Sequence, residues 1–580
     1  MGLRQRTKRQ TGNVKALGHL VGKINRIVLI YGRVNFFSSP MNIKGRINPI
    51  LMLGFALLQG CATQSTRPGI RLVSEAKTLL NLAETHRNMP SVAAGYYLDA
   101  AHRASRTLEI SSKTERHEAI LIYNRAAEEL TVLLRSTPAL WNRTQTFHSS
   151  QSSYRLHFAS SMKQDGILDP DYFTFFRTRK QVREQNLAQR DRENGLGGIL
   201  VGVNQPKDPR ALFLPLVGVT APVTVALDFS EVNEYTYHVT LSLNDPTKRS
   251  TVKINGINHP LAADLTAPLA YYPDPALLGF LAMLRPGDYI HRSGIYLLQP
   301  YDPDRIPVLL IHGLTSEPQM WFNMINDIEA DPVMRGRFQF WVFGYPTGSP
   351  IAYSALQLRE SLNGIYKTYP KTKNLVLVGH SLGGVLSQMQ AVNTDRVLFN
   401  GIFKNKADTI YASLPGDDVI KKALIFKSNP HISEIIFICT PHLGSRLATG
   451  PIGNLGVSLI QLPGNVVNTM LDGVKGSLEV IAGMNDKKIP DGIQGLSPKS
   501  SLLLSLNTLP IQPPFYSIVG TRGWPGPLRD SSDGVVPYWS SHLAGARAEL
   551  TVPYFHSCCE RPKTVSTVKQ ILLKHQLHQP

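Results

Sequence analysis

The chain has 580 residues, of which 42% are hydrophobic and 18% charged, a composition typical of a folded protein and not of a disordered tail or a fibre. Its 61 Lys and Arg against 42 Asp and Glu give a net charge of +19, but ten of these cations lie in residues 1–60, which contain no Asp or Glu. The remainder therefore carries only +9 (19 − 10), spread along the chain, so we expect no nucleic-acid partner. Four cysteines are too few for a disulfide framework or a Cys-rich zinc module.

Residues 1–60 have the features of an export signal. From Met41 onward, two cations, Lys44 and Arg46, precede an apolar run over Ile50–Leu58. This run is too short to span a bilayer, which needs about 20 apolar residues, and it has the length of the hydrophobic region of a signal peptide. We therefore expect translation to begin at Met41, with the residues before it a dispensable leader or an over-extended start.

The apolar run ends in Leu-Gln-Gly-Cys at Leu58–Cys61, which resembles the lipobox of bacterial lipoproteins. The resemblance implies cleavage before Cys61 and acylation of its thiol and of the new N-terminus, because a thiolate is the soft nucleophile that accepts the lipid. Several acyl chains give stable membrane anchoring, whereas one alone is marginal. Since Ala62 and not Asp follows the cysteine, the resemblance also implies the outer membrane, facing the periplasm. The alternative is a buried helix with an ordinary cysteine.

Two modules are predicted between this signal and the second half of the chain. Residues 61–140 show helical spacing of apolar side chains, above all in Ser91–Leu108 and Lys113–Ser136, and are predicted as a helical module. Residues 141–295 begin with mixed, polar sequence, and from about Leu212 to His259 the period changes to two, which predicts a mixed module with β-strands. Within it, the charged stretch Arg177–Arg192 is predicted as the solvated face of a helix. Together the two modules are too long to be only a spacer, so they could bind a protein partner or form the entrance to a substrate site.

Residues 296–580 alternate short apolar runs with amphipathic segments. The runs are Val308–Ile311, Phe338–Phe343, Leu375–Val378, Ile435–Cys439 and Phe515–Val519. Fully apolar strands separated by helices indicate a mostly parallel sheet that is buried on both faces. The predicted fold class is therefore α/β.

The strongest chemical signal is Gly-His-Ser-Leu-Gly at residues 379–383, between an apolar strand and a helical pattern. This is the setting of a nucleophile elbow, a turn so sharp that side chains at Gly379 and Gly383 would clash. Ser381 is expected in a strained conformation with its hydroxyl exposed. The N-terminus of the following helix would bring backbone N–H groups and a positive dipole end to a developing oxyanion.

With this elbow, residues 300–580 resemble the α/β-hydrolase superfamily, and most of all the branch that holds bacterial triacylglycerol lipases and GPI inositol-deacylase-like lipases. A strand that ends in His312-Gly313 is a further match. In that family the residue after His-Gly donates an oxyanion-hole N–H, and the residue after the nucleophile donates the second. The resemblance assigns these roles to Leu314 and Leu382, and it implies neither a metal nor an organic cofactor.

A segment that begins Ser-Asp-Gly-Val at residue 532 resembles the part of these lipases that carries the triad acid. Asp533 follows the strand-like run Phe515–Val519, and His556 follows 23 residues later. The chain order Ser381, Asp533, His556 is the nucleophile, acid, base order of α/β-hydrolases. His556 is expected to take the proton of Ser381, and Asp533 to fix the imidazole tautomer.

Other residue types in this region leave alternatives open. Asp530 could be the acid and His542 the base, although His542 lies only nine residues from Asp533 with no strand between them. His442, in a Thr-Pro-His turn, precedes the acid in chain order, which argues against a catalytic role. Related lipases can bind calcium through an Asp two residues after the base. That position is Cys558 here, so no calcium site is predicted.

Two further expectations concern the cysteines and a cap. The adjacent Cys558 and Cys559 could form a vicinal disulfide or be two small packed residues. Residues 445–500 are apolar and rich in Gly and Pro, and we expect them to form a cap above the sheet, either a mobile lid or a fixed insertion.

Taken together, the sequence predicts a serine carboxylic-ester hydrolase that acts through an acyl-serine intermediate, anchored to the bacterial envelope, with an acyl ester or a lipid as substrate. A thioesterase or an acyltransferase on the same site remains open, because fold-level analogy does not fix a substrate. The rival from another class is a non-catalytic envelope lipoprotein that keeps the fold as a scaffold.

Overall fold

The computed structural model describes residues 68–110, 112–160, 166–182, 187–207, 213–272, 293–446 and 494–576. The predicted signal peptide, the predicted acylation site Cys61 and most of the predicted cap lie outside the described residues. Within the described part, no helix has both the length and the apolar character that crossing a membrane requires.

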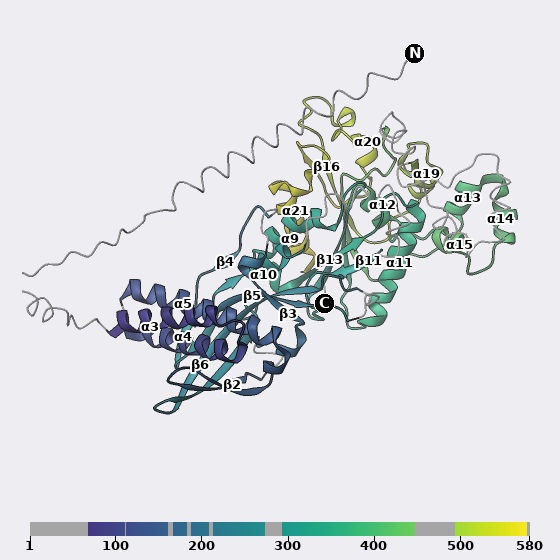
Figure 1. Ribbon diagram of the computed structural model, residues 1–580. Coiled ribbons are helices and arrows are strands. Elements are labelled where there is room, and N and C mark those ends of the chain that lie inside the picture. Colours follow the sequence, from purple (N-terminus) through teal and green to yellow (C-terminus); the bar gives the residue numbers. More distant parts are fainter. Residues whose placement is uncertain are drawn as a thin grey trace, which may run out of the picture. The chain divides into compact units, whose positions relative to one another are not determined.

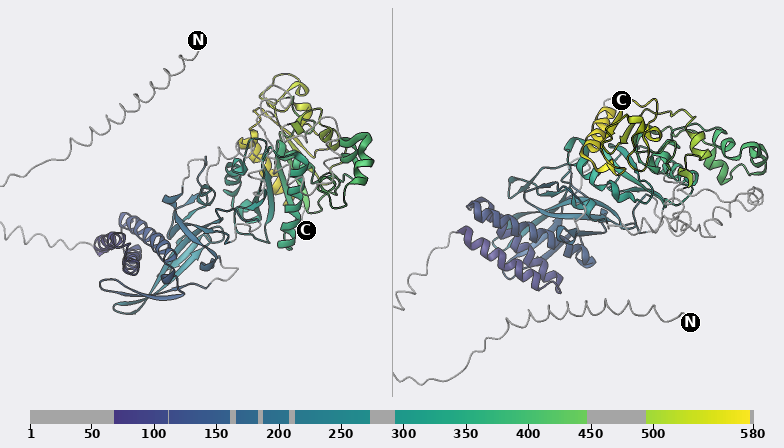
Figure 2. Two further views of the ribbon diagram at one scale, coloured as in Figure 1. Left: turned by 45° about the vertical axis from the view of Figure 1, so that its right-hand side comes forward. Right: turned by 90° about the horizontal axis from the view of Figure 1, so that it is seen from above.

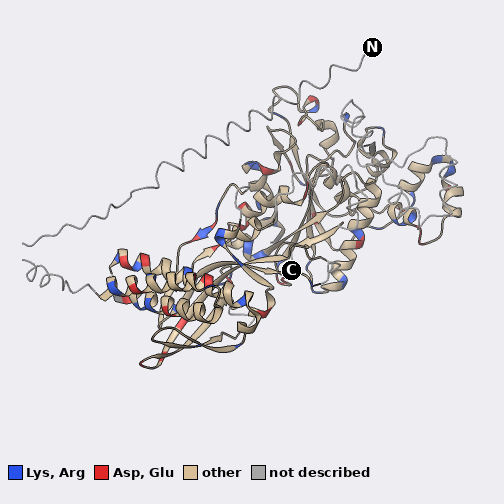
Figure 3. Cartoon of the chain, viewed as in Figure 1, with Lys and Arg blue, Asp and Glu red and all other residues tan. Residues whose placement is uncertain are grey.

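The described chain begins with three helices that lie side by side (Figure 1). They are α3 (Pro68–Thr85), α4 (Pro90–Ile110) and α5 (Lys113–Ser136). A capping box starts α5, in which Ser112 and Glu115 each accept from the other's backbone N–H. Cations and anions interleave along the three helices (Figure 3), and several form ion pairs within or between helices.

A six-stranded sheet packs against these helices, and two further views show them along one of its faces (Figure 2). Its strand order is β1-β2-β7-β6-β5-β3, antiparallel except for the β2–β7 pair. The strands are β1 (Thr144–His148), β2 (Ser153–Phe158), β3 (Phe175–Thr178), β5 (Gly198–Asn204), β6 (Val219–Asn233) and β7 (Thr236–Asn244). Short pairs and one short helix complete the region: β4 (Arg192–Glu193) with β10 (Ala263–Asp264), β8 (Thr251–Ile254) with β9 (Ile257–Pro260), and α6 (Ala267–Ala270).

Helices and sheet share one hydrophobic core. The hydroxyl of the fully buried Tyr123 on α5 donates to the carbonyl of Leu227 on β6 at 2.8 Å and accepts from its N–H at 2.7 Å. A Cβ added to Gly198 on β5 would lie 2.6 Å from the backbone nitrogen of Glu128, so only glycine permits this approach of helix and strand. The two predicted N-terminal modules are therefore packed as one body.

The helix predicted over Arg177–Arg192 is wrong for the described residues of that stretch. They form β3, a short 3-10 turn over Arg179–Gln181, and β4. The reason lies in Asp264, whose side chain is fully buried and pairs with Arg192 at 2.7 Å and with Arg179 at 3.6 Å. Two cations of the stretch, Arg179 and Arg192, thus pair with a buried carboxylate, which costs less than leaving that carboxylate unpaired. Arg177, Lys180 and Arg190 are exposed, but they do not lie on an α-helix.

A second sheet of seven strands follows, in the order β11-β13-β12-β14-β15-β16-β17. Every neighbouring pair is parallel except β11–β13. The strands are β11 (Gly294–Leu297), β12 (Ile306–Ile311), β13 (Phe338–Gly344), β14 (Leu375–His380), β15 (Ile432–Ile438), β16 (Phe515–Gly520) and β17 (Glu549–Val552). The five apolar runs predicted as strands correspond to β12–β16, and the described chain is a mixed α/β protein.

Alternate side chains of these strands enter two different cores. On β12, Leu309 and Ile311 join one core, while Val308 and Leu310 join the other. Helices cover both faces, as the continuous apolar runs predict. The helices of this region are α9 (Phe322–Glu329), α10 (Pro332–Arg337), α11 (Ile351–Thr368), α12 (Leu382–Gln388), α13 (Val397–Phe403), α14 (Ala407–Ser413), α15 (Val419–Leu424), α19 (Ser501–Leu506), α20 (Tyr538–Ser541) and α21 (Pro562–Gln576).

Strand β5 belongs to two cores at once. Leu200 joins the core under α3–α5, whereas its neighbours Val201 and Val203 join the core of the second sheet. A polar contact joins the two regions as well: the hydroxyl of Thr266, just before α6, donates to the side-chain oxygen of Asn326 on α9 at 3.0 Å. The first sheet therefore packs against α3–α5 on one face. On its other face it packs against the layer of helices, including α9, that also covers the second sheet.

Candidate active site

Ser381 occupies the turn between β14 and α12, with φ 53° and ψ −122°, a left-handed conformation that a non-glycine residue adopts only under constraint. The neighbouring glycines make the turn sterically possible. A Cβ on Gly379 would lie 2.6 Å from the Cα of Gly384, and one on Gly383 would lie 2.1 Å from the carbonyl oxygen of Ile311. The strand, the turn and the helix have the arrangement that the sequence predicted for a nucleophile elbow.

The segment after β12 lies directly against this turn. Because β12 and β14 are adjacent and parallel, their carboxyl ends meet at one edge of the sheet. A Cβ added to Gly313 would lie 2.8 Å from the Cβ of Ser381, so the backbone of the predicted oxyanion loop touches the nucleophile turn. Leu314 follows at once, and the N–H of Thr315 donates to the hydroxyl of Thr347 at 3.3 Å, which ties the loop to the end of β13.

Leu382, the other predicted oxyanion residue, begins α12 and is buried. The first N–H groups of a helix have no acceptor within the helix, so they point outward beyond its N-terminus. In α12 this N-terminus lies at Ser381. The backbone near Leu314, in the loop after β12, and the backbone of Leu382, at the start of α12, therefore both border the Ser381 side chain.

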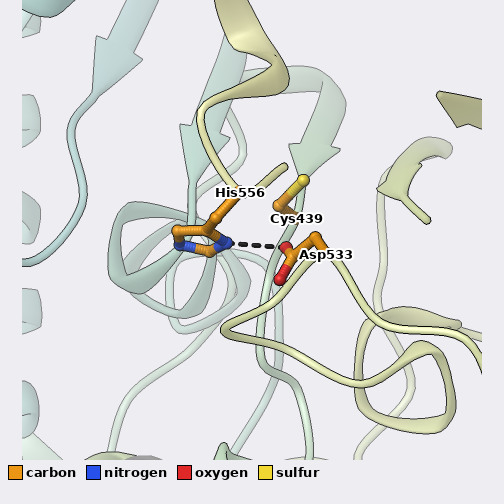
Figure 4. Close-up of side chains that lie close together, drawn as sticks. All are labelled: Cys439, Asp533 and His556. Atoms are coloured by element: carbon orange, nitrogen blue, oxygen red, sulfur yellow. Dashed lines mark hydrogen bonds and ion pairs between the residues drawn. The ribbon is translucent and has the colours of Figure 1, made fainter. Parts of the chain in front are cut away.

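Asp533 and His556 meet at the same edge of the sheet, in the segments that follow β16 and β17 (Figure 4). Nδ1 of His556 lies 2.7 Å from Oδ2 of Asp533. Since an ionised carboxylate only accepts, Nδ1 carries the proton and Nε2 is left as the free basic nitrogen. This is the tautomer that a general base next to a serine needs.

The Asp533 carboxylate is 2% exposed but well supported. Its Oδ1 accepts from the backbone N–H of Val535 at 2.8 Å and of Val536 at 2.6 Å. Burial by itself raises the pKa of Asp533, but the hydrogen bond and charge of His556 and the two backbone donors outweigh burial and hold the pKa below its usual value. Asp533 therefore stays ionised beside the imidazole at neutral pH.

No hydrogen bond between described residues joins Ser381 to His556. Catalytic hydrogen bonds are often long without substrate and tighten when it binds. The three residues nevertheless follow β14, β16 and β17, strands whose carboxyl ends share one edge.

The residues that the sequence left as alternatives lie elsewhere. Nδ1 of His542 pairs with Oε2 of Glu549 at 2.7 Å, and the side chain is 48% exposed. Asp530 is 57% exposed, and its one ion pair within the described part of the chain is with its neighbour Arg529, at 3.9 Å. His442 is buried, donates from Nδ1 to Gln388 at 2.8 Å, and has its pKa lowered to about 3 by burial.

His380 is a residue of the site that sequence reasoning missed. Its Nε2–H donates to the backbone carbonyl of His556 at 2.9 Å, and the two rings lie 4.8 Å apart. Burial first, and then repulsion by His556, lower the pKa of His380 to about 3, so its imidazole is neutral. The residue before the nucleophile thus holds the backbone of the base. Its place at the end of an apolar strand was the only sequence signal.

A third side chain, Cys439, lies beside the acid and the base (Figure 4). Its Sγ lies within 4.8 Å of a carboxylate oxygen of Asp533 and of a ring nitrogen of His556. Three such atoms could in principle ligate a cation. The Cys558 thiol and burial raise the pKa of Cys439 well above its usual value, so the thiol is protonated and a poor ligand. Asp533 and His556 already engage each other, which favours an acid–base pair over a metal site.

No protein-family profile matches this chain. No curated protein is similar to it either. Among solved structures, the mature lipase BlEst2 of Bacillus licheniformis is similar at 17% identity and a TM-score of 0.30, over 48% of this chain and 97% of the lipase. A thermophilic esterase from Thermogutta terrifontis is similar at 15% identity and 0.24, over 47% and 90%. An esterase from Exiguobacterium antarcticum is similar at 13% identity and 0.24, over 49% and 95%.

Proposed function

We propose that the chain is a serine hydrolase of carboxylic esters, with Ser381 as nucleophile, His556 as general base and Asp533 as its orienting acid. The observation that carries the proposal is the 2.7 Å bond between His556 and Asp533 at the sheet edge where the strained Ser381 turn lies. A buried carboxylate that fixes one imidazole nitrogen leaves the other free to take a proton.

The reaction follows from these roles. Nε2 of His556 takes the hydroxyl proton as Oγ of Ser381 bonds to the ester carbonyl carbon, and the carbonyl oxygen becomes an oxyanion. When the tetrahedral intermediate collapses, the bond to the alcohol oxygen breaks and His556 returns the proton to that oxygen. Water, deprotonated by the same nitrogen, then attacks the acyl-serine, and the carboxylic acid leaves as the proton returns to Ser381.

The oxyanion is proposed to bind the backbone N–H groups of Leu314 and Leu382. Two observations support this: the contact of Gly313 with Ser381, and the position of Leu382 as the first residue of α12. Fixed donors cost no reorganisation during the reaction, and the loss of one such donor typically slows an enzyme by about 10²–10³-fold.

The cellular setting is part of the proposal. A chain acylated at Cys61 is held at the membrane, and the envelope, most of all the outer membrane facing the periplasm, is the proposed location. An acyl ester or a lipid is the proposed substrate, and the N-terminal body is proposed to contact a protein partner or to border the substrate site. The lipobox-like Leu58–Cys61 sequence supports the anchor.

The first experiment compares full-length protein in detergent with S381A, H556N and D533N. The readouts are labelling by a fluorophosphonate probe and hydrolysis of p-nitrophenyl esters of increasing acyl length. We expect each variant to lose about 10³-fold or more in kcat/KM, and S381A to lose labelling altogether. The matched controls are H542N and D530N, which remove the same residue types from the neighbouring positions and should retain activity.

Each outcome has a consequence for the proposal. Folded wild-type protein without labelling or turnover would reject it and favour the scaffold alternative, above all if a protein partner stays bound to S381A. If the wild type is labelled but H542N loses activity and H556N does not, the general base would be His542 and not His556. Thioester cleavage or transfer to an added alcohol that exceeds ester hydrolysis would keep the site but change the reaction class to a thioesterase or an acyltransferase.

A further inference from the structure

Two cysteines that lie 119 positions apart in the sequence meet behind the catalytic groups. Sγ of Cys439, the residue after β15, lies 3.1 Å from Sγ of Cys558, two residues after His556. Both side chains are fully buried. Two thiols at this separation need to move by about 1 Å to reach the S–S bond length.

Cys559 offers an internal comparison. It is adjacent to Cys558 and 3% exposed, yet among the described residues it has no hydrogen bond to another thiol. Of the two alternatives for Cys558 and Cys559, a vicinal disulfide or two packed residues, the structure shows two unjoined residues, and Cys558 faces Cys439. Burial alone therefore does not bring sulfur atoms together here.

We propose that Cys439 and Cys558 form a disulfide that fastens the His556 segment to the end of β15. The bond would form by thiol–disulfide exchange with a small or protein disulfide R–S–S–R. One cysteine thiolate attacks it and releases RS⁻, and the second attacks the mixed disulfide and releases another RS⁻. The two cysteines are oxidised, one R–S–S–R is reduced to two thiols, and the two cysteine protons leave with them.

The position gives the bond a mechanical role. Cys439 has φ 48°, a left-handed conformation, so the chain is strained at the point of attachment. A Cβ on Gly520 would lie 3.4 Å from the Cys439 sulfur and 2.7 Å from the Cβ of Asp533, so sulfur, acid and β16 are in one packed group. The bond would hold the segment after the base, while His380 holds the base's own carbonyl.

Burial determines when the bond can form. Exchange needs a thiolate, and the pKa of Cys439 lies well above its usual value in the folded chain. We therefore expect the disulfide to form during folding in an oxidising compartment and to persist afterwards. This inference does not depend on the proposed ester hydrolysis.

The direct test maps the disulfide by mass spectrometry. The full chain is produced in a bacterial cytoplasm that lacks its disulfide reductases, denatured without reductant, alkylated and digested. We expect a linked peptide pair that contains Cys439 and Cys558, with Cys559 alkylated. C559A should give the same link and C558A should give none. Alkylation of Cys439, Cys558 and Cys559 alike in the wild type, or a link that uses Cys559, would overturn the proposal.

A second test measures thermal unfolding with and without a phosphine reductant. A loop of this length predicts that reduction lowers the melting temperature of the wild type and of C559A by about 5 °C. C558A should show no dependence on reductant. If C558A does not fold, the mass map of the wild type still decides the question. A wild-type protein that has the Cys439–Cys558 disulfide but hydrolyses no ester would reject the proposed function and leave the disulfide proposal standing.

Discussion

At the scale of single residues, His380, which directly precedes the proposed nucleophile Ser381, is joined to the proposed base His556 by one hydrogen bond. Its neutral imidazole donates to the carbonyl of His556, and nothing else among the described residues accepts from it. A small shift of His556 relative to Ser381 would slow the proposed proton transfer between them. His380 is therefore a positioning residue of the proposed reaction.

Replacement of His380 tests this role. We expect H380A to lower kcat about 10-fold or more with KM nearly unchanged, since orientation and not binding is lost. H380Q keeps an amide donor and should recover part of the loss. H442A removes another buried histidine, which donates to Gln388, and serves as the control. Equal losses in H380A, H380Q and H442A would mean that the effect is only structural.

At the scale of elements, the turn between β14 and α12 depends on the absence of side chains. The carbonyl of Ile311 on β12 lies where a Cβ of Gly383 would be, at 2.1 Å, and backbone atoms of a central strand cannot move aside. The position of Ser381 is therefore fixed by the packing of α12 on β12. The expected exposure of Ser381 is wrong, because the residue is only 5% exposed at this crowded turn.

This packing predicts a sharp contrast between two glycines. G383A should destabilise the fold by about 3 kcal/mol or more, or prevent soluble expression, because the added methyl group forces the helix off the sheet. G336A, in α10, meets no atom within 4 Å and should leave stability within about 1 kcal/mol of the wild type. Chemical denaturation of both variants is the measurement. A G383A protein as stable as G336A would contradict this account of the turn.

At the scale of the whole molecule, burial of histidines makes stability depend on pH. Burial holds the pKa of four of them far below 6.5: His102 and His312 at about 4, His380 and His442 at about 3. As pH falls below 6.5, each takes up a proton in the unfolded chain but not in the folded one, so stability falls. Two buried carboxylates with raised pKa values of about 7 act in the opposite direction, Glu128 and Glu329.

Near pH 5.5 these six groups together contribute about two protons taken up on unfolding (4 − 2), or about 2.7 kcal/mol of stability lost per pH unit. H442Q removes one of these protons and should make stability fall less steeply with acidification. Unfolding free energies of both proteins between pH 6.5 and 5 check this. An unchanged slope in H442Q would show that His442 is not held neutral by burial.

The sequence was informative where local pattern and structure coincide. Continuous apolar runs predicted the strands of the second sheet, and small residues around Ser381 predicted its turn. Chain order, and the absence of a strand between Asp533 and His542, favoured Asp533 and His556 over Asp530 and His542. The structure adds the 2.7 Å pair of His556 with Asp533, whereas His542 pairs with Glu549. Charge misled at Arg177–Arg192, because a buried partner such as Asp264 is distant in the sequence.

Long-range pairing is what local pattern could not supply. The sequence contains Cys439 and Cys558 with no sign that they meet, since spacing does not determine which cysteines pair. Likewise, Leu200 and Val201 are both apolar, so the sequence does not show that their side chains enter two different cores. His380 was missed for the same reason, because its partner is a backbone carbonyl that lies 176 positions away.

The double membership of β5 bears on how the chain loses its structure. Pulling α3–α5 away uncovers one side of β5, and detaching the second sheet uncovers the other, so neither can leave without weakening what remains. The described chain is thus a single cooperative unit in spite of its two sheets, and heat should melt it in one transition. We therefore expect that the N-terminal body cannot be exchanged or removed as a separate part, because it helps to hold the edge of the second sheet where Ser381, Asp533 and His556 lie.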